Sequence, residues 1–139
     1  MANAISLPAA LTSVSPLAAW LAQQVAPLSV SDEWRFALDL AVCETATNII
    51  RHALHEDGER RFTVEFIAAA SGVMLRFTDA GDPFPADCLA AARDNPLFDT
   101  DPLAESGRGV KLILSYVDTF TAENREGKNV TVLEKRMSG

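Results

Sequence analysis

The chain has 139 residues, 48% of them hydrophobic, and carries 12 basic against 19 acidic side chains, for a net charge of -7. This size and composition fit one globular domain over residues 1–139 and exclude disorder and collagen-like repeats. The negative charge argues against direct nucleic-acid binding, which needs a basic face to displace counterions. Cys43 and Cys88 lack a metal-binding spacing, and reduced thiols indicate a cytoplasmic protein.

The charge is unevenly distributed along the chain. Residues 1–31 contain no charged side chain, but they are not an export signal, because they lack a basic start and are interrupted by Pro8 and Pro16. No uninterrupted apolar stretch approaches about 18 residues, so the sequence predicts no membrane span. Residues 79–106 carry one basic and seven acidic groups and are the most acidic part of the chain.

The first third of the chain is predicted to contain a short strand and two helices. The strand covers Ile5–Leu7. Ser15 is a suitable N-cap for a first helix over residues 16–25, which begins with proline. Ser31 is a suitable N-cap for a longer second helix that reaches about residue 55, since its apolar residues recur at helical spacing.

The rest of the chain is predicted to be mostly strands. Apolar and polar residues alternate around residues 62–66 and 73–77, and two final strands are expected around 119–124 and 130–135. Between these pairs lie a long loop, residues 80–106, and a helix that opens at a glycine-rich turn. This order predicts an α+β fold, a two-layer α/β sandwich with helices on one face of a mixed, mostly antiparallel sheet.

One candidate site lies on the second predicted helix. Glu44 and Asn48 are four residues apart and therefore lie one above the other on a single helix face. The carboxylate could accept a proton from an attacking hydroxyl, and the amide oxygen could bind Mg²⁺. The same spacing is common in the polar stripes of amphipathic helices, and this pair alone favours that interpretation.

Two further candidates contain glycine. Asp79-Ala-Gly81 directly follows a predicted strand, where the carboxylate could accept a hydrogen bond from an exocyclic amine and the glycine could let backbone approach a ligand. A simple tight turn is the alternative.

Gly107-Arg108-Gly109 precedes a helix, and amides at such a helix start favour phosphate. A glycine-rich helix start without a ligand is its alternative.

The order and spacing of these segments resemble the N, G1 and G2 boxes of the GHKL ATPase superfamily. The segments LDLAVCETATNIIRHAL, LRFTDAGDPFP, DPLAESGRGVKLILSYVDTF and GKNVTVLEKR are similar to those of the stand-alone anti-sigma factor serine/threonine kinases. The resemblance extends from about Leu7 to Arg136. It implies a histidine-kinase-like ATPase domain of the Bergerat (GHKL) fold, with ATP and Mg²⁺ held under a flexible lid at about residues 80–106.

The resemblance implies a role for each motif residue. Glu44 is expected to be the catalytic base for the substrate hydroxyl, and Asn48 to ligate Mg²⁺. Asp79 is expected to hold the adenine amine, with Gly81 packed against the base. The remaining expected ATP-binding residues are His52, for which a packed helix histidine is the alternative, and Gly107, Arg108, Gly109 and Val110.

The resemblance also implies a partner-switching protein kinase. Its expected partners are a sigma factor, which it holds inactive, and a STAS-domain anti-sigma factor antagonist, which it phosphorylates on Ser or Thr. A homodimer is also expected, through a first helix with Leu17, Trp20 and Leu21 exposed. One alternative is a non-catalytic GHKL-fold regulatory binding module, which the presence of both Glu44 and Asn48 disfavours. The other is a detached histidine-kinase catalytic domain, disfavoured because no helix with a phospho-acceptor His precedes the ATP domain.

Overall fold

The computed structural model describes residues 2–83 and 113–137. Two helices, α1 (Val14–Val25) and α2 (Asp32–Asn48), and five strands lie wholly within these residues, and residues 113–116 are also helical. The strands are β1 (Ala2–Pro8), β2 (Arg61–Ala69), β3 (Gly72–Asp79), β4 (Thr119–Arg125) and β5 (Lys128–Arg136). A 3-10 turn, Leu11–Ser13, precedes α1, and a π-helical turn, Ile49–Ala53, extends α2. Both helices and all five strands match predicted elements to within a few residues, and the 3-10 turn was not predicted.

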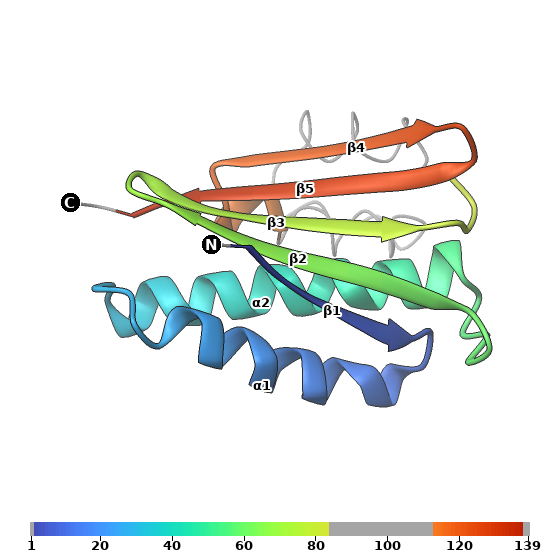
Figure 1. The fold of residues 1–139 in the computed structure, drawn as a ribbon, viewed down its shortest axis with the longest axis horizontal. Helices are drawn as coiled ribbons and strands as arrows, with labels where there is room; N and C mark the ends of the chain where they lie inside the picture. The colour runs from blue at the N-terminus through green and yellow to red at the C-terminus, as the bar shows by residue number, and fades with distance from the viewer. Residues whose placement is uncertain (1, 84–112, 138–139) are drawn as a thin grey trace, which may run out of the picture.

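The five strands form one sheet in the order β1-β2-β3-β5-β4. Both helices lie on the same face of this sheet (Figure 1), which confirms the predicted two-layer sandwich. Every pairing between the described strands is antiparallel, whereas the prediction was a mixed sheet in which most pairings are antiparallel. The β4–β5 hairpin turns at Glu126 and Gly127, which both have positive φ, as a two-residue type I′ turn requires.

The core lies between the sheet and the helices. Successive strand side chains point to opposite faces, and the buried ones are alternate residues that meet their partners in register. Val64 pairs with Phe77, and Leu75 pairs with Leu133. From the helix layer, Leu38 packs into the same core. All five of these side chains are fully buried.

Helix α2 is fixed at its start by hydrogen bonds to the helix cap and to the sheet. The Ser31 hydroxyl accepts a hydrogen bond from the Trp34 backbone N–H at 3.1 Å, which confirms the predicted N-cap. The Trp34 indole N–H donates to the Arg136 carbonyl at 2.7 Å, and the Lys135 ammonium lies 5.8 Å from the centroid of the indole ring. These contacts place the start of α2 at the end of β5, so its other end arrives near the end of β3.

Helix α1 departs from the prediction in two ways. It begins at Val14, after Ser13 rather than Ser15, and the Ser13 hydroxyl donates to the Pro8 carbonyl at 2.8 Å. Leu17 and Leu21 are 0% and 2% exposed, so the prediction that they form an exposed dimer face was wrong. The reason is that α1 packs between β1 and α2 and turns these leucines into the core. The homodimer itself stays a prediction.

Substitutions at two neighbouring residues of β3 test which face of the sheet is packed against the helices. Leu75 faces the helix layer and is fully buried, whereas Met74 points to the other face and is partly exposed. We expect Leu75→Ala to lower the free energy of unfolding by about 2–5 kcal/mol, because it leaves a cavity in the core. Met74→Ala is the control and should cost about 1 kcal/mol or less. Urea denaturation measures both, and equal losses would contradict the assignment of the two faces.

Candidate functional site

The last turns of α2 carry two of the predicted site residues on one helix face. Glu44 and Asn48 are both partly exposed, and four residues separate them by roughly 6 Å along the helix axis. The Asn48 Nδ2 atom is buried and has no hydrogen-bond partner within residues 2–83 and 113–137. An unpaired buried donor costs about 1–3 kcal/mol, so this amide is a group in need of an acceptor.

Directly after Asn48 the helix widens into a π-helical turn and then stops. The Leu54 backbone N–H donates to the Ile49 carbonyl at 2.9 Å, five residues back, which is the hydrogen bond of a π-helix. His55 and Glu56 follow with φ of 53° and 55°, the left-handed conformation that ends helices. π-helical turns are rare within α-helices and are frequent at functional sites.

The turn that follows β3 packs against this helix end. The Asp82 backbone N–H donates to the Ala53 carbonyl at 2.9 Å, and His55 Nε2 lies 2.6 Å from Asp82 Oδ2. A Cβ atom built on Gly81 would lie only 2.2 Å from the Ala53 carbonyl oxygen. Glycine is therefore required here for contact with the helix end. The contact brings two predicted site segments, the end of α2 and the turn after β3, together.

Asp79 is the last residue of β3 and is held by a side chain from β5. It is 5% exposed and lies opposite Asn129 in the antiparallel register. The Asn129 Nδ2 atom is 3.1 Å from each carboxylate oxygen of Asp79 and also donates to the carbonyls of Gly81 at 3.2 Å and Asp82 at 2.8 Å. One buried amide thus joins the carboxylate to the turn that follows it.

The environment of Asp79 has opposing effects on its pKa. Burial raises the pKa, while the hydrogen bonds from Asn129 and from the Gly81 backbone lower it, as does the charge of Arg60. Burial dominates, so the pKa lies above the ordinary aspartate value. The Arg60 guanidinium donates to the Ala80 carbonyl at 2.7 Å and so also holds the turn after β3 in place.

Cys43, which neighbours Glu44 on α2, is not a candidate nucleophile. Burial, and then the nearby carboxylates of Asp39 and Glu44, raise the pKa of its thiol to about 11. Its Sγ donates weakly to Asp39 Oδ1 at 3.8 Å. Since the thiolate is the reactive form, Cys43 stays an inert thiol at neutral pH.

The structure places five of the predicted site residues. Glu44, Asn48 and His52 lie on α2 and its π-helical turn, with His52 exposed, and Asp79 and Gly81 lie at the end of β3. Gly107, Arg108, Gly109 and Val110, together with residues 84–106 of the expected lid, fall outside the described residues.

Sequence reasoning missed Asn129 as a site residue. The last strand was expected around residues 130–135, so Asn129 lay just before it and was given no role. The alternation on β5 gave no usable signal, because Val130 and Val132 are the apolar alternate residues, whereas the buried face is formed by Asn129, Thr131 and Leu133. A polar residue in a core-facing register needs a polar partner, and Asp79 is that partner.

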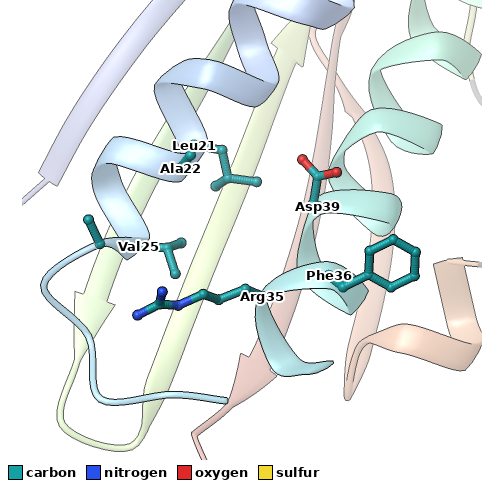
Figure 2. A pocket seen from close by; sticks show the side chains of 7 residues that line it. Leu21, Ala22, Val25, Arg35, Phe36 and Asp39 are labelled. Atoms are coloured by element: carbon teal, nitrogen blue, oxygen red, sulfur yellow. The ribbon is translucent and has the colours of Figure 1, made fainter. Parts of the chain in front are cut away.

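A groove of about 330 Å³ lies elsewhere, between α1 and the first turns of α2 (Figure 2). Its lining is mostly apolar and comes from both helices: Leu21, Ala22, Val25, Ala26, Arg35, Phe36 and Asp39. Phe36 is 62% exposed. The lining contains none of the predicted site residues, although Asp39 lies only five residues, or roughly 7.5 Å along α2, before Glu44.

The fold and the paired helix-end and strand-end motifs define an ATPase domain of the GHKL type. A family model described as the histidine kinase-like ATPase domain matches residues 7–135, and the chain belongs to this family. It is similar to the serine-protein kinase RsbW of Bacillus subtilis (strain 168), with 28% identity over 97 residues. The match covers 68% of this chain and 61% of RsbW, so the chain spans less than two thirds of that relative.

Two solved structures share the fold. The structure of the RsbU and RsbW domains of Rv1364c from Mycobacterium tuberculosis has a TM-score of 0.71 at 16% identity, covering 100% of this chain and 33% of that one. The SiaB-SiaC complex from Pseudomonas aeruginosa has a TM-score of 0.65 at 13% identity, covering 97% and 89%. These two matches confirm the fold, while the similarity to RsbW confirms the resemblance to the serine/threonine kinases that the motifs indicated. No helix in the described part of the chain is long and apolar enough to cross a membrane.

Gly81→Ala tests the contact on which the site is built. The added methyl would overlap the Ala53 carbonyl and displace the turn after β3, so we expect a loss of about 1–3 kcal/mol in the free energy of unfolding. Gly58→Ala is the matched control, because a Cβ at Gly58 meets nothing within 4 Å. Its effect should stay within about 0.5 kcal/mol. Chemical denaturation measures both variants, and an unchanged Gly81→Ala protein would refute the contact.

Proposed function

We propose that the protein is an anti-sigma factor and an ATP-dependent serine/threonine protein kinase. In this role it sequesters a sigma factor and phosphorylates a STAS-domain anti-sigma factor antagonist in the cytoplasm. The observation that carries the proposal is the meeting of the Glu44–Asn48 helix end with the Asp79–Gly81 turn in a histidine kinase-like ATPase domain. Similarity to the serine-protein kinase RsbW supports the choice of a serine or threonine acceptor.

The residues present fit a nucleotide with Mg²⁺. The Asn48 Nδ2 atom is a buried donor without a partner in the described part of the chain, which a phosphate oxygen would satisfy, and the Asn48 Oδ1 atom is an oxygen ligand of the kind that Mg²⁺ takes. Asp79 offers a buried carboxylate as an acceptor for the exocyclic amine of adenine. When bound, Mg²⁺ neutralises charge on the phosphates. Asn48 would hold the metal, and Asp79 and Gly81 would hold the base.

Glu44 would act as the base in the transfer step. The oxygen of the substrate hydroxyl forms a bond to the γ-phosphorus, the bond from that phosphorus to the bridging oxygen of ADP breaks, and the hydroxyl proton passes to the Glu44 carboxylate. Because Glu44 lies one helical turn before Asn48, its carboxylate would lie beside the phosphates of a nucleotide whose metal Asn48 holds. ADP leaves with the electron pair of the broken bond.

Glu44→Gln should abolish phosphoryl transfer while nucleotide binding persists. General bases of this kind contribute about a hundredfold or more to rate, and glutamine keeps the shape of the side chain but cannot take the proton. The assay incubates the protein with γ-labelled radioactive ATP and each purified STAS-domain protein of the source organism. Glu33→Gln, an exposed acid at the other end of α2, is the control and should transfer phosphate like the wild type.

The outcomes of that assay separate the two functions considered. No transfer to any STAS-domain protein by the wild type, together with stable binding to one of them, would replace the kinase with a non-catalytic binding module. Full transfer by Glu44→Gln would remove Glu44 from its role as base.

Asn48→Ala should separate stability from nucleotide affinity. The substitution removes a buried donor without a described partner and adds a better helix former, so the free energy of unfolding of the free protein should not fall. The affinity for ADP in the presence of Mg²⁺ should fall about tenfold or more, because a metal ligand is lost. Thermal unfolding and titration calorimetry measure the two quantities. A strong loss of stability with unchanged affinity would identify Asn48 as a purely structural residue.

A further inference from the structure

We propose that Asn129, held in place by Asn124, is a positioning residue that orients the Asp79 carboxylate and the Gly81–Asp82 turn for the nucleotide base. The proposal rests on the nucleotide site proposed above and goes beyond it, since it assigns part of that site to the β4–β5 hairpin. Asn129 lies in the segment GKNVTVLEKR but was given no site role there, and Asn124 lies outside the quoted segments.

The hydrogen bonds around Asn129 dictate how its amide is turned. On one side four oxygens lie between 2.8 and 3.2 Å from Nδ2, two from the Asp79 carboxylate and two from the carbonyls of Gly81 and Asp82. On the other side the Asn124 amide donates to Asn129 Oδ1 at 2.9 Å. A flipped amide would place an oxygen against four acceptors and a nitrogen against a donor, so only one orientation is satisfied.

The register of the sheet produces this arrangement. Asp79 on β3 pairs with Asn129 on β5, and Asn129 pairs with Asn124 on β4. The three side chains therefore form a row across neighbouring strands at one end of the sheet. Asn124 is exposed, whereas Asn129 and Asp79 are 6% and 5% exposed. The row connects a solvent-facing hairpin to the buried carboxylate.

The amide has a chemical as well as a geometric effect on Asp79. An ionised carboxylate accepts stronger hydrogen bonds than a protonated one, so the amine of the nucleotide base should bind best to Asp79 in its charged form. Burial raises the Asp79 pKa and the bond from Asn129 opposes this rise. The other charged groups around the turn are Arg60, whose charge also lowers that pKa, and the His55–Asp82 pair. Loss of the Asn129 donor should move protonation of Asp79, and with it the loss of nucleotide affinity, to higher pH.

The test measures the Kd for ADP with Mg²⁺ by calorimetry between about pH 5 and about pH 9. Asn129→Ala should bind ADP about tenfold more weakly at neutral pH, and its affinity should begin to fall at a higher pH than that of the wild type. Asn124→Ala keeps the donor but frees it to turn, and should show a smaller change in the same direction. Because Asn124 is exposed, this variant preserves the test if Asn129→Ala fails to fold.

Thr131→Val is the matched control. Thr131 is 6% exposed, shares the inner face of β5 with Asn129, and pairs with Phe77 and Ala122 rather than with Asp79. Its Kd and its pH profile should be those of the wild type. Wild-type affinity and pH profile in both asparagine variants would overturn the proposal, as would an equal shift in Thr131→Val.

A second measurement separates this proposal from the proposed function. The titration of the Asp79 carboxyl carbon, followed by NMR in the free protein, requires no nucleotide. A higher midpoint in Asn129→Ala than in the wild type supports the positioning role, and an unchanged midpoint overturns it. Failure of the wild type to bind ADP would instead overturn the nucleotide site, whatever the NMR titration shows.

Discussion

The approach of the turn after β3 to the end of α2 is the contact on which the candidate site depends. Gly81 has no side chain to hold the two backbones apart, and the Asp82 amide bonds to the Ala53 carbonyl at the last turn of the helix. The segments are far apart in sequence, yet one carries the proposed catalytic base and metal ligand, and the other carries the residue proposed to bind adenine. Without this approach, Glu44 and Asn48 would be an ordinary polar stripe on an amphipathic helix.

This contact is possible because α2 is fixed at both ends. The bond from Trp34 to the Arg136 carbonyl sets where the helix starts, and the length of the helix then determines where it ends. Sheet register completes the arrangement by placing Asp79 opposite Asn129. Since a slip of one residue turns every strand side chain to the other face, the apolar core that fixes the register also fixes the site.

Much of this structure could be predicted from local patterns, because periodicity and helix caps are local. The Ser31 cap, the strands and the two-layer arrangement belong to that group. The faces of α1 could not be assigned, because apolar residues such as Leu17 and Trp20 occur around most of the helix and only packing decides which are buried. Asn129 could not be assigned either, because a polar residue at the start of a strand also fits a turn. Contacts between distant segments leave no local signal.

Two groups at the site reduce the stability of the free protein. Asn48 has a buried donor without a described partner. The pKa of Asp79 is raised in the folded state, so its contribution to stability is complete below the unfolded pKa of about 4 and is lost as the pH rises through the folded value. At neutral pH the ionised Asp79 is therefore a cost, which Asn129 limits but does not remove. Both groups have the chemistry that a nucleotide with Mg²⁺ would satisfy, so the features that weaken the free fold are those that would strengthen the complex.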